Sequence, residues 1–267
     1  MKLTVAYSPC PNDTFMFHAL ASGRVALPGF EIETHLHDVE TLNRLALATT
    51  FDITKVSFYV WLRLRQTYSL LQSGAALGFG CGPIVVARQP IDRRDWPGTT
   101  IAVPGELTTA HLLLRLWAPE MERRVFVPYD RIIPMVAGGE VQAGVIIHES
   151  RFVFASAGLV PVQDLGAWWE GETGLPIPLG CVIARQSLGA ATILAFERGL
   201  RQSVANALAA PEATAEYVRR YAQELDEDVL RQHIQTFVNP FSLDLGPAGL
   251  AAVARLESMA RTRGILP

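Results

Sequence analysis

The residue best suited to acid–base chemistry in this sequence is a histidine that ends a buried apolar run. His148 follows residues 144–147 and is followed by Glu149. Because an imidazole can hold or release a proton near neutral pH, the pattern predicts a general base at the end of a strand. A structural, hydrogen-bonding histidine is the alternative. Glu149 is interpreted either as the group that orients His148 or as an exposed side chain.

A second group of polar residues lies in the loop after the first apolar segment. Ser8, Asn12 and Asp13 share this loop with two prolines, Pro9 and Pro11. Prolines fix the backbone, so the loop suits a preorganised pocket wall. Capping of the following helix is the simpler interpretation of Asp13 taken alone.

The third candidate segment is Lys55, Val56 and Ser57, where an apolar strand ends. Lys55 is able to pair with a ligand anion. The alternative is a surface lysine beside an N-cap serine.

The fourth candidate segment is Thr108, Thr109 and Ala110, at the predicted start of a helix. Free backbone N–H groups and hydroxyls at a helix N-terminus suit a carboxylate or a phosphate. An ordinary N-cap explains one of the two threonines but not both.

Other patterns are less specific. The six histidines and three cysteines lack the spacing of a metal site, so we predict no metal. No dinucleotide, Walker or hydrolase motif stands in a fitting context, which disfavours a dehydrogenase, a kinase or a serine hydrolase. Residues 164–180 contain Trp168 and Trp169. They are interpreted either as an aromatic wall of the cleft or as tryptophans packed between helices.

The elements that must position these residues alternate between strands and helices. The apolar patterns predict strands at 3–7, 30–36, 51–56, 84–87, 100–103, 125–127, 144–147, 159–164 and 180–184. Helices are predicted at 14–22, 39–48 behind an Asp38 cap, 58–66, 110–117, 132–138, 191–209, 212–221, 226–237 and 247–262. Alternation of this kind predicts a parallel sheet, with a ligand crevice beyond the carboxyl ends of its strands.

The length of 267 residues suits two α/β lobes. We expect a first lobe from residues 1–88, a second lobe from 89–184, and a helical return to the first lobe over 185–267. The glycine-rich residues 74–82 are expected near the crossover. Two crossings between lobes predict a hinge that opens and closes around a ligand.

Composition narrows the class of partner. The net charge is −3, with 49% hydrophobic and 18% charged residues, which indicates a compact chain without the basic surface that binds nucleic acid or an anionic membrane. The partner is expected to be a small molecule, bound by a monomer or a homodimer. Three separated cysteines and the lack of a signal-like or membrane-spanning run favour the cytoplasm.

Taken together, the segments resemble the 1,4-dihydroxy-6-naphthoate synthase family of the futalosine route to menaquinone. The resemblance covers nearly the whole chain and is carried by residues 8–15, 38–43, 54–57, 144–152, 164–180 and 237–244. It implies a periplasmic-binding-protein type II-like fold: two α/β lobes with a hinge and a ligand cleft between them.

The resemblance also implies an activity. Members of this family are cofactor-independent lyases that convert cyclic dehypoxanthine futalosine into 1,4-dihydroxy-6-naphthoate. His148 matches the family's catalytic base. Thr109 and Ala110 match one substrate-binding pair, and Lys55, Val56 and Ser57 match a second contact segment, so the substrate carboxylate is expected to meet these residues.

Two rival functions share this fold. One is a non-enzymatic solute-binding protein for small anions, and the other is the chorismate dehydratase of the same pathway. The His148 segment and the tryptophan pair resemble the naphthoate synthase more closely than the dehydratase.

Overall fold

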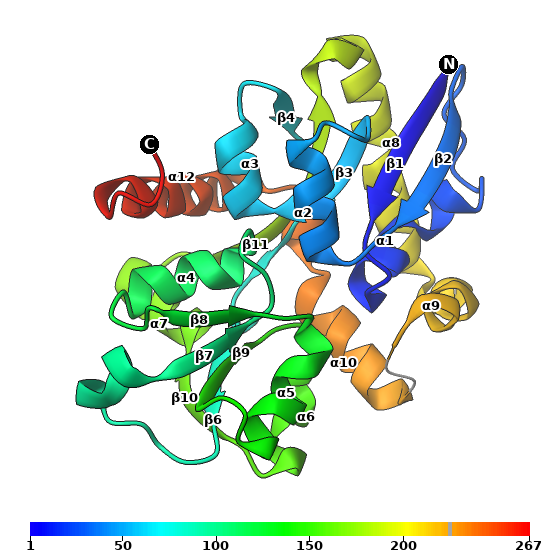
Figure 1. Ribbon diagram of the computed structural model, residues 1–267. Helices are drawn as coiled ribbons and strands as arrows, with labels where there is room; N and C mark the ends of the chain where they lie inside the picture. The colour runs from blue at the N-terminus through cyan, green and yellow to red at the C-terminus, as the bar shows by residue number, and fades with distance from the viewer. Residues whose placement is uncertain (224–225) are drawn as a thin grey trace.

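The computed structural model describes residues 1–223 and 226–267 and folds into two sheets with helices packed around them (Figure 1). The first sheet contains β1 (Lys2–Tyr7), β2 (Glu31–Leu36), β3 (Ile53–Ser57), β4 (Tyr68–Leu70), β5 (Ala76–Gly78) and β11 (Ile177–Arg185). The second contains β6 (Ile84–Ala87), β7 (Thr100–Val103), β8 (Arg123–Phe126), β9 (Ala143–Ile146) and β10 (Val160–Asp164). All nine predicted strands are therefore present, within a few residues of their expected bounds.

The helices also follow the predicted order. They are α1 (Pro11–Ala21), α2 (Val39–Leu47), α3 (Phe58–Leu64), α4 (Thr109–Trp117), α5 (Tyr129–Gly138), α6 (Ser150–Val153), α7 (Leu165–Thr173), α8 (Ala190–Ala209), α9 (Ala215–Tyr221), α10 (Glu227–Phe237), α11 (Pro240–Leu243) and α12 (Gly246–Thr262). Asp38 caps α2 as predicted, its side chain accepting from the N–H groups of Glu40 and Thr41. The start of α1 was predicted three residues too late, because proline is favourable in the first helical turn.

The prediction of a parallel sheet was wrong in part, because both sheets are mixed. The first has the order β2-β1-β3-β11-β4, and β5 also pairs with β11. β1 is parallel to β2 and β3, whereas β11 is antiparallel to β3, β4 and β5. In the second sheet, β10-β6-β9-β7-β8, the strand β6 is antiparallel to both neighbours. The antiparallel strands are those next to the crossings, where the chain enters a sheet from the other one.

Alternation along β1 explains how the first sheet is covered. Val5 and Tyr7 belong to a core with Phe17 of α1 and Leu200 of α8, whereas Ala6 faces Leu42 of α2 on the opposite side. Successive side chains of a strand point to opposite faces, so one strand packs against helices from both sides.

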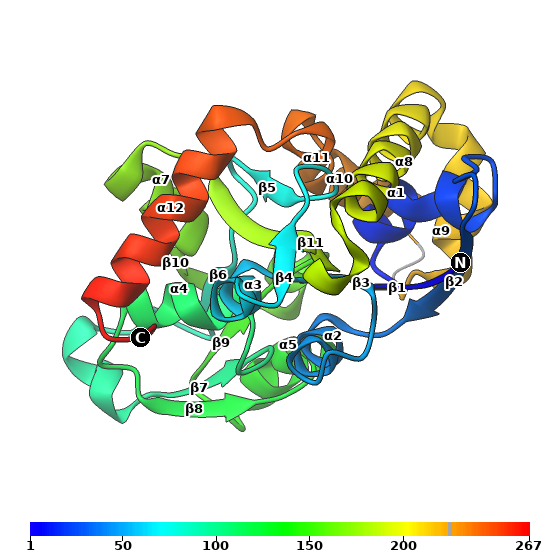
Figure 2. The same cartoon turned by 90° about the horizontal axis from the view of Figure 1, so that it is seen from above.

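The second sheet is covered in the same way. Val86 packs with Ile132 of α5, while its neighbour Val85 joins a larger core on the other face. That larger core also contains Val56 of β3 and Leu256 of α12. Because α12 contacts both β11 and α4, apolar packing continues from one sheet to the other (Figure 2).

The chain passes from one sheet to the other before the expected boundaries at residues 88 and 184. β6 already belongs to the second sheet, and β11 already belongs to the first. The crossings thus lie between β5 and β6, at the end of the glycine-rich stretch, and between α7 and β11. The division into separate domains stays a prediction. Among the described residues, no helix combines the length and apolarity that crossing a bilayer requires.

Candidate functional site

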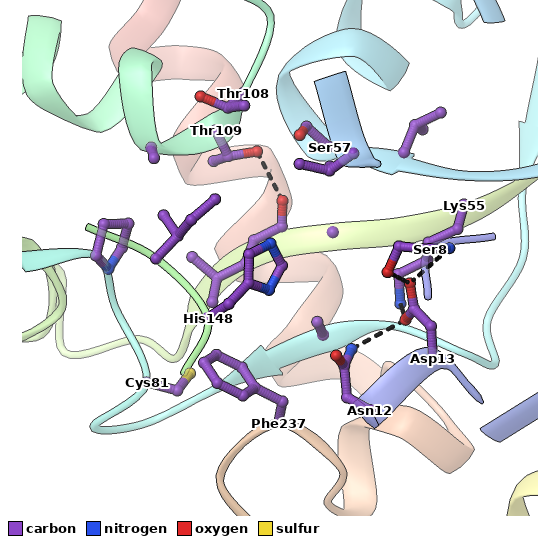
Figure 3. A pocket seen from close by; sticks show the side chains of 18 of the residues that line it. Ser8, Asn12, Asp13, Lys55, Ser57, Cys81, Thr108, Thr109, His148 and Phe237 are labelled. Carbon is purple, nitrogen blue, oxygen red and sulfur yellow. Dashed lines mark hydrogen bonds and ion pairs between the residues drawn. The ribbon is translucent and has the colours of Figure 1, made fainter. Parts of the chain in front are cut away.

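A cavity lies between the two sheets, where β1, β3 and β9 end and where α1 and α4 begin. Its empty volume is about 710 Å³ with its opening to solvent included. All ten residues singled out from the sequence line it: Ser8, Asn12, Asp13, Lys55, Val56, Ser57, Thr108, Thr109, Ala110 and His148 (Figure 3). Tertiary structure thus brings four distant segments to one place.

The cavity also has lining residues that sequence reasoning did not select. They are Val39, Leu42, Ala76, Cys81, Gly82, Pro83, Ile147, Leu179, Gly180 and Phe237. Most of these residues are apolar, so the lining of the cavity is largely hydrophobic. Phe237 lies at the end of α10, on the same helix as His233. Its i,i+4 spacing from His233 was a signal that both side chains share one helix face.

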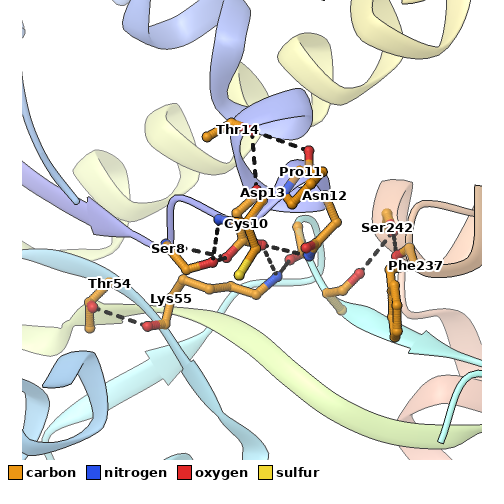
Figure 4. Close-up of polar contacts among 12 residues, drawn as sticks. Ser8, Cys10, Pro11, Asn12, Asp13, Thr14, Thr54, Lys55, Phe237 and Ser242 are labelled. Atoms are coloured by element: carbon orange, nitrogen blue, oxygen red, sulfur yellow. Dashed lines mark hydrogen bonds and ion pairs between the residues drawn. The ribbon is translucent and has the colours of Figure 1, made fainter. Parts of the chain in front are cut away.

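The wall formed by the first sheet is an ion-pair network (Figure 4). The Asp13 carboxylate accepts hydrogen bonds from Ser8 Oγ at 2.7 Å and Asn12 Nδ2 at 2.9 Å, and it lies 3.1 Å from Lys55 Nζ. The interpretation of Asp13 as a helix cap was wrong, since α1 has Cys10 at its N-cap position and no side-chain cap. Asp13 instead balances a buried lysine.

Lys55 is 5% exposed, so the alternative of a surface lysine was wrong. Its ammonium also donates to the carbonyl of Gly74 at 2.6 Å. Asp13 and this carbonyl offset the cost of removing a charge from water. The cation is thus already paired inside the protein, which argues against Lys55 as the free partner of a ligand anion.

Ser57 is held by a residue that the sequence did not reveal. Asn43 of α2 donates from Nδ2 to Ser57 Oγ at 3.1 Å and accepts from the Ser57 N–H at 2.9 Å. Ser57 occupies the N-cap position of α3, but its hydroxyl makes no cap hydrogen bond. The amide of Asn43 therefore orients the hydroxyl beside the cavity.

The two threonines at the start of α4 have different partners. Thr108 is the N-cap, accepting from the N–H of His111 at 3.2 Å. The Thr109 hydroxyl instead donates to the carbonyl of Leu179 at 2.7 Å, on a strand of the other sheet. The N–H groups in the first turn of a helix have no acceptor within that helix, so this turn presents backbone donors to the cavity.

His148 has an unusual backbone conformation. Its φ of 55° lies in the left-handed region, which is uncommon for a residue other than glycine. The side chain is partly buried, with Nε2 4.0 Å from Cys10 Sγ. Burial lowers the pKa of His148 to about 4, against the opposing attraction of Glu149. At neutral pH the imidazole is therefore uncharged and able to accept a proton.

Glu149 is buried, so its interpretation as an exposed side chain was wrong. Its Oε1 accepts from the Tyr129 hydroxyl at 3.0 Å, and its Oε2 lies 3.5 Å from Nδ1 of His233. Burial opposes ionisation, but His233 and then His148 outweigh it and hold the pKa of Glu149 at about 2. A carboxylate therefore sits beside the candidate base at neutral pH.

Donor atoms of His148, Glu149 and His233 lie within 4.8 Å of one another, a grouping that is also compatible with a metal ion. Sequence spacing did not indicate it because His233 comes from a distant helix. The hydrogen bond between His233 Nε2 and Asn12 Oδ1, 3.0 Å long, gives the cluster a second explanation as a connected polar network.

The tryptophan pair does not form a cavity wall. Trp169 is fully buried in the shared core, where its Nε1 donates to the carbonyl of Pro176 at 3.1 Å, and Trp168 packs against that core. Neither lines the cavity, so the packing interpretation is correct. Leu179 and Gly180, at the end of the same segment, do reach the cavity.

Two mixed α/β sheets with a ligand cavity between them define a periplasmic-binding-protein-like fold. Known structures have the same fold. An alkanesulfonate-binding protein from Xanthomonas axonopodis pv. citri superposes with a TM-score of 0.73 at 14% identity, over 100% of this chain and 94% of that one. A crystal structure of an Archaeoglobus fulgidus protein superposes with a TM-score of 0.94 at 37% identity, over 99% of this chain and 98% of that one.

A family model described as menaquinone biosynthesis matches residues 3–262, and the chain belongs to this family. Two relatives carry the name 1,4-dihydroxy-6-naphthoate synthase. The one from Thermus thermophilus is 52% identical, over 98% of this chain and 95% of its own length. The one from Streptomyces coelicolor is 44% identical, over 99% of this chain and 95% of its own length. The resemblance recognised from the sequence is thus confirmed.

Proposed function

We propose that this protein is a 1,4-dihydroxy-6-naphthoate synthase, a cofactor-independent lyase that acts on cyclic dehypoxanthine futalosine with His148 as the general base. The position of His148 carries the proposal: an uncharged imidazole lies in the turn after β9 and lines a mainly apolar cavity whose other walls come from both sheets. The names of two relatives with high identity along nearly the full chain support the same activity.

In this mechanism the apolar lining holds the ring system of the substrate. Its carboxylate accepts hydrogen bonds from the first turn of α4 and from the Ser57 hydroxyl, as anions at helix N-termini do. His148 then removes a proton and the strained ring opens. Carbon–carbon cleavage releases the sugar-derived fragment as a small ketose-like product, and the remaining ring system aromatises to the naphthoate. Exclusion of bulk water from the closed cavity strengthens these polar contacts.

The Lys55–Asp13 pair has a supporting role in this proposal. Because its charges are balanced within the wall, it keeps Ser8 and Asn12 in fixed positions along the cavity rather than neutralising the substrate. The three free cysteines are all buried, which agrees with work in a reducing cytoplasm.

The test is product formation by the wild type and by His148→Asn. Asparagine tolerates a positive φ, so this variant removes the base with little backbone cost. We expect the wild type to form the naphthoate and the variant to be slower by about 10²–10⁴-fold. His37→Asn, a histidine outside the cavity lining, is the matched control and should keep its activity.

Other outcomes would point to the rival functions. Dehydration of chorismate, with no product from the cyclic substrate, would identify the sister enzyme. Binding of the cyclic substrate without turnover by any variant would favour a solute-binding protein. Full activity of His148→Asn would keep the enzyme but remove His148 as its base.

A further inference from the structure

We propose that His233 is a positioning residue for the base: it holds Glu149, and through Glu149 the adjacent His148, when the two sheets are closed on each other. This inference rests on the proposed function and extends it to a residue of α10, a helix that contacts α1 and β5. His233 is 0% exposed and is not itself a cavity-lining residue.

The first step of the argument is the anchoring of His233. Asn12 donates from Nδ2 to Asp13, so its Oδ1 is free to accept a hydrogen bond from His233 Nε2 at 3.0 Å. Asp13 in turn pairs with Lys55. The ring of His233 is therefore fixed to the buried ion-pair network of the first sheet.

The second step is the contact with Glu149. With Nε2–H donating to Asn12, the other ring nitrogen, Nδ1, faces Glu149 Oε2 at 3.5 Å, and it can donate to this carboxylate oxygen when the ring is protonated on both nitrogens. This distance is longer than the usual 2.7–3.2 Å of an N–H···O hydrogen bond, and both atoms are buried without a hydrogen-bond partner. Hydrogen bonds of catalytic groups are often long without substrate and shorten when it binds. A closure of a few tenths of an ångström would complete this one.

The third step connects Glu149 to the base. Glu149 directly follows His148, whose left-handed backbone must be held by its surroundings. The hydroxyl of Tyr129, at the start of α5, donates to the other carboxylate oxygen at 3.0 Å, and the side-chain amide of Gln223 lies 2.7 Å from the same hydroxyl oxygen. The rings of His148 and His233 lie nearly parallel, with centroids 6.0 Å apart. Glu149 thus lies between Tyr129 of α5 and His233 of α10.

A structural histidine that serves only to anchor Asn12 is the competing explanation, and two substitutions separate them. In His233→Asn the side-chain amide takes the place of Nδ1 and can still reach Glu149. In His233→Gln the amide takes the place of Nε2 and keeps only the bond to Asn12. The pair therefore removes one contact at a time.

We expect His233→Gln to lower kcat by about 10–100-fold with KM changed by less than about 3-fold, because a base displaced by up to 1 Å loses rate more than binding. His233→Asn should keep more of kcat than His233→Gln. Both variants are first compared by thermal unfolding. If His233→Asn is the slower of the two, or if the loss of kcat follows the loss of stability, the anchoring explanation holds and the inference is wrong.

A substrate-free measurement separates this inference from the proposed function. Hydrogen–deuterium exchange of the segment 147–153 should be faster in His233→Gln than in His233→Asn, with exchange in β1 and β3 equal in the two. Equal exchange at 147–153 would overturn the inference whether or not the protein is a naphthoate synthase. Failure of the wild type to turn over the cyclic substrate would instead overturn the proposed function.

Discussion

The two sides of the cavity differ in how completely their polar groups are paired. On the side of the first sheet, the Asp13 carboxylate has partners on both oxygens and Lys55 has two acceptors. On the side of the second sheet, His148 has a left-handed backbone, and Oε2 of the neighbouring Glu149 lacks a hydrogen bond. The first wall is satisfied and rigid, whereas the second holds strain and unused polar atoms.

This difference indicates that the first wall supports the site and that the second wall carries the chemistry. A buried charge network that is fully paired contributes shape and fixed orientation, because changing any member leaves another unsatisfied. Strained backbone and incompletely bonded groups persist only where the surrounding structure maintains them, and they gather at functional sites. Substitutions in the first wall should therefore alter stability, and substitutions in the second should alter activity.

The largest effect on stability is expected from Asp13→Asn. Loss of the carboxylate leaves Lys55 buried with an unbalanced charge, which should lower the free energy of unfolding by about 3–5 kcal/mol, measured by urea denaturation. The double variant Asp13→Asn/Lys55→Met removes both charges and should recover much of that loss. A single variant as stable as the wild type would mean that the first wall is not held by this pair.

The dependence of kcat/KM on pH tests the second wall of the cavity. Burial lowers the pKa of His148 to about 4, so the base stays uncharged as pH falls through the usual histidine range. We expect kcat/KM to be constant from about pH 5 to 8 and to fall below that, as His148 is protonated near its folded pKa. A midpoint near 6.5 would contradict this, because it would indicate a solvated imidazole.

The strain at His148 has its own test. Glycine adopts positive φ freely, whereas alanine does not, so His148→Gly should be more stable than His148→Ala by about 1 kcal/mol. Both should lack activity. Thermal unfolding of the two variants gives the difference directly. If alanine were equal or better, the backbone at this position would not be strained.

The smallest effect is expected at the contact between the walls. Thr109→Val removes the hydrogen bond to the carbonyl of Leu179 while keeping the shape of the side chain. The loss should be about 1 kcal/mol of stability, with KM raised a few-fold because closure is weakened. Thr109→Ser keeps the hydroxyl and is the matched control, which should remain closer to the wild type. Equal behaviour of the two variants would assign no role to this bond.

Local sequence was sufficient for much of the fold and for the membership of the site. The strand at 84–87 and the helix cap at Asp38 follow from short-range patterns, and both are present. The loops after β1, β3 and β9 were selected because strand ends meet at one edge. The direction of β6 and β11 was missed, since the antiparallel pairing depends on which sheet the chain enters after each crossing.

The hydrogen-bond and ion-pair partners of the site residues could not be predicted from local sequence either, because they come from distant parts of the chain. A helix cap was the simpler interpretation of Asp13 taken alone, and a surface lysine was one of two interpretations of Lys55. The two residues lie 42 positions apart in sequence and meet only across β1 and β3. His233 was set aside because the histidines lack the sequence spacing of a metal site, and its neighbours His148 and Glu149 are far from it in the chain.

The sequence by itself determined the α/β class, the family, the order of nine strands and nine helices, and ten of the residues that line the cavity, because these depend on periodicity, loop chemistry and resemblance. The tertiary structure alone decided which charges are paired, which sheet each crossing strand joins, and which groups face His148. Those properties depend on distances between segments that the chain brings together only on folding, and electrostatic and hydrogen-bond energies fall steeply with such distances.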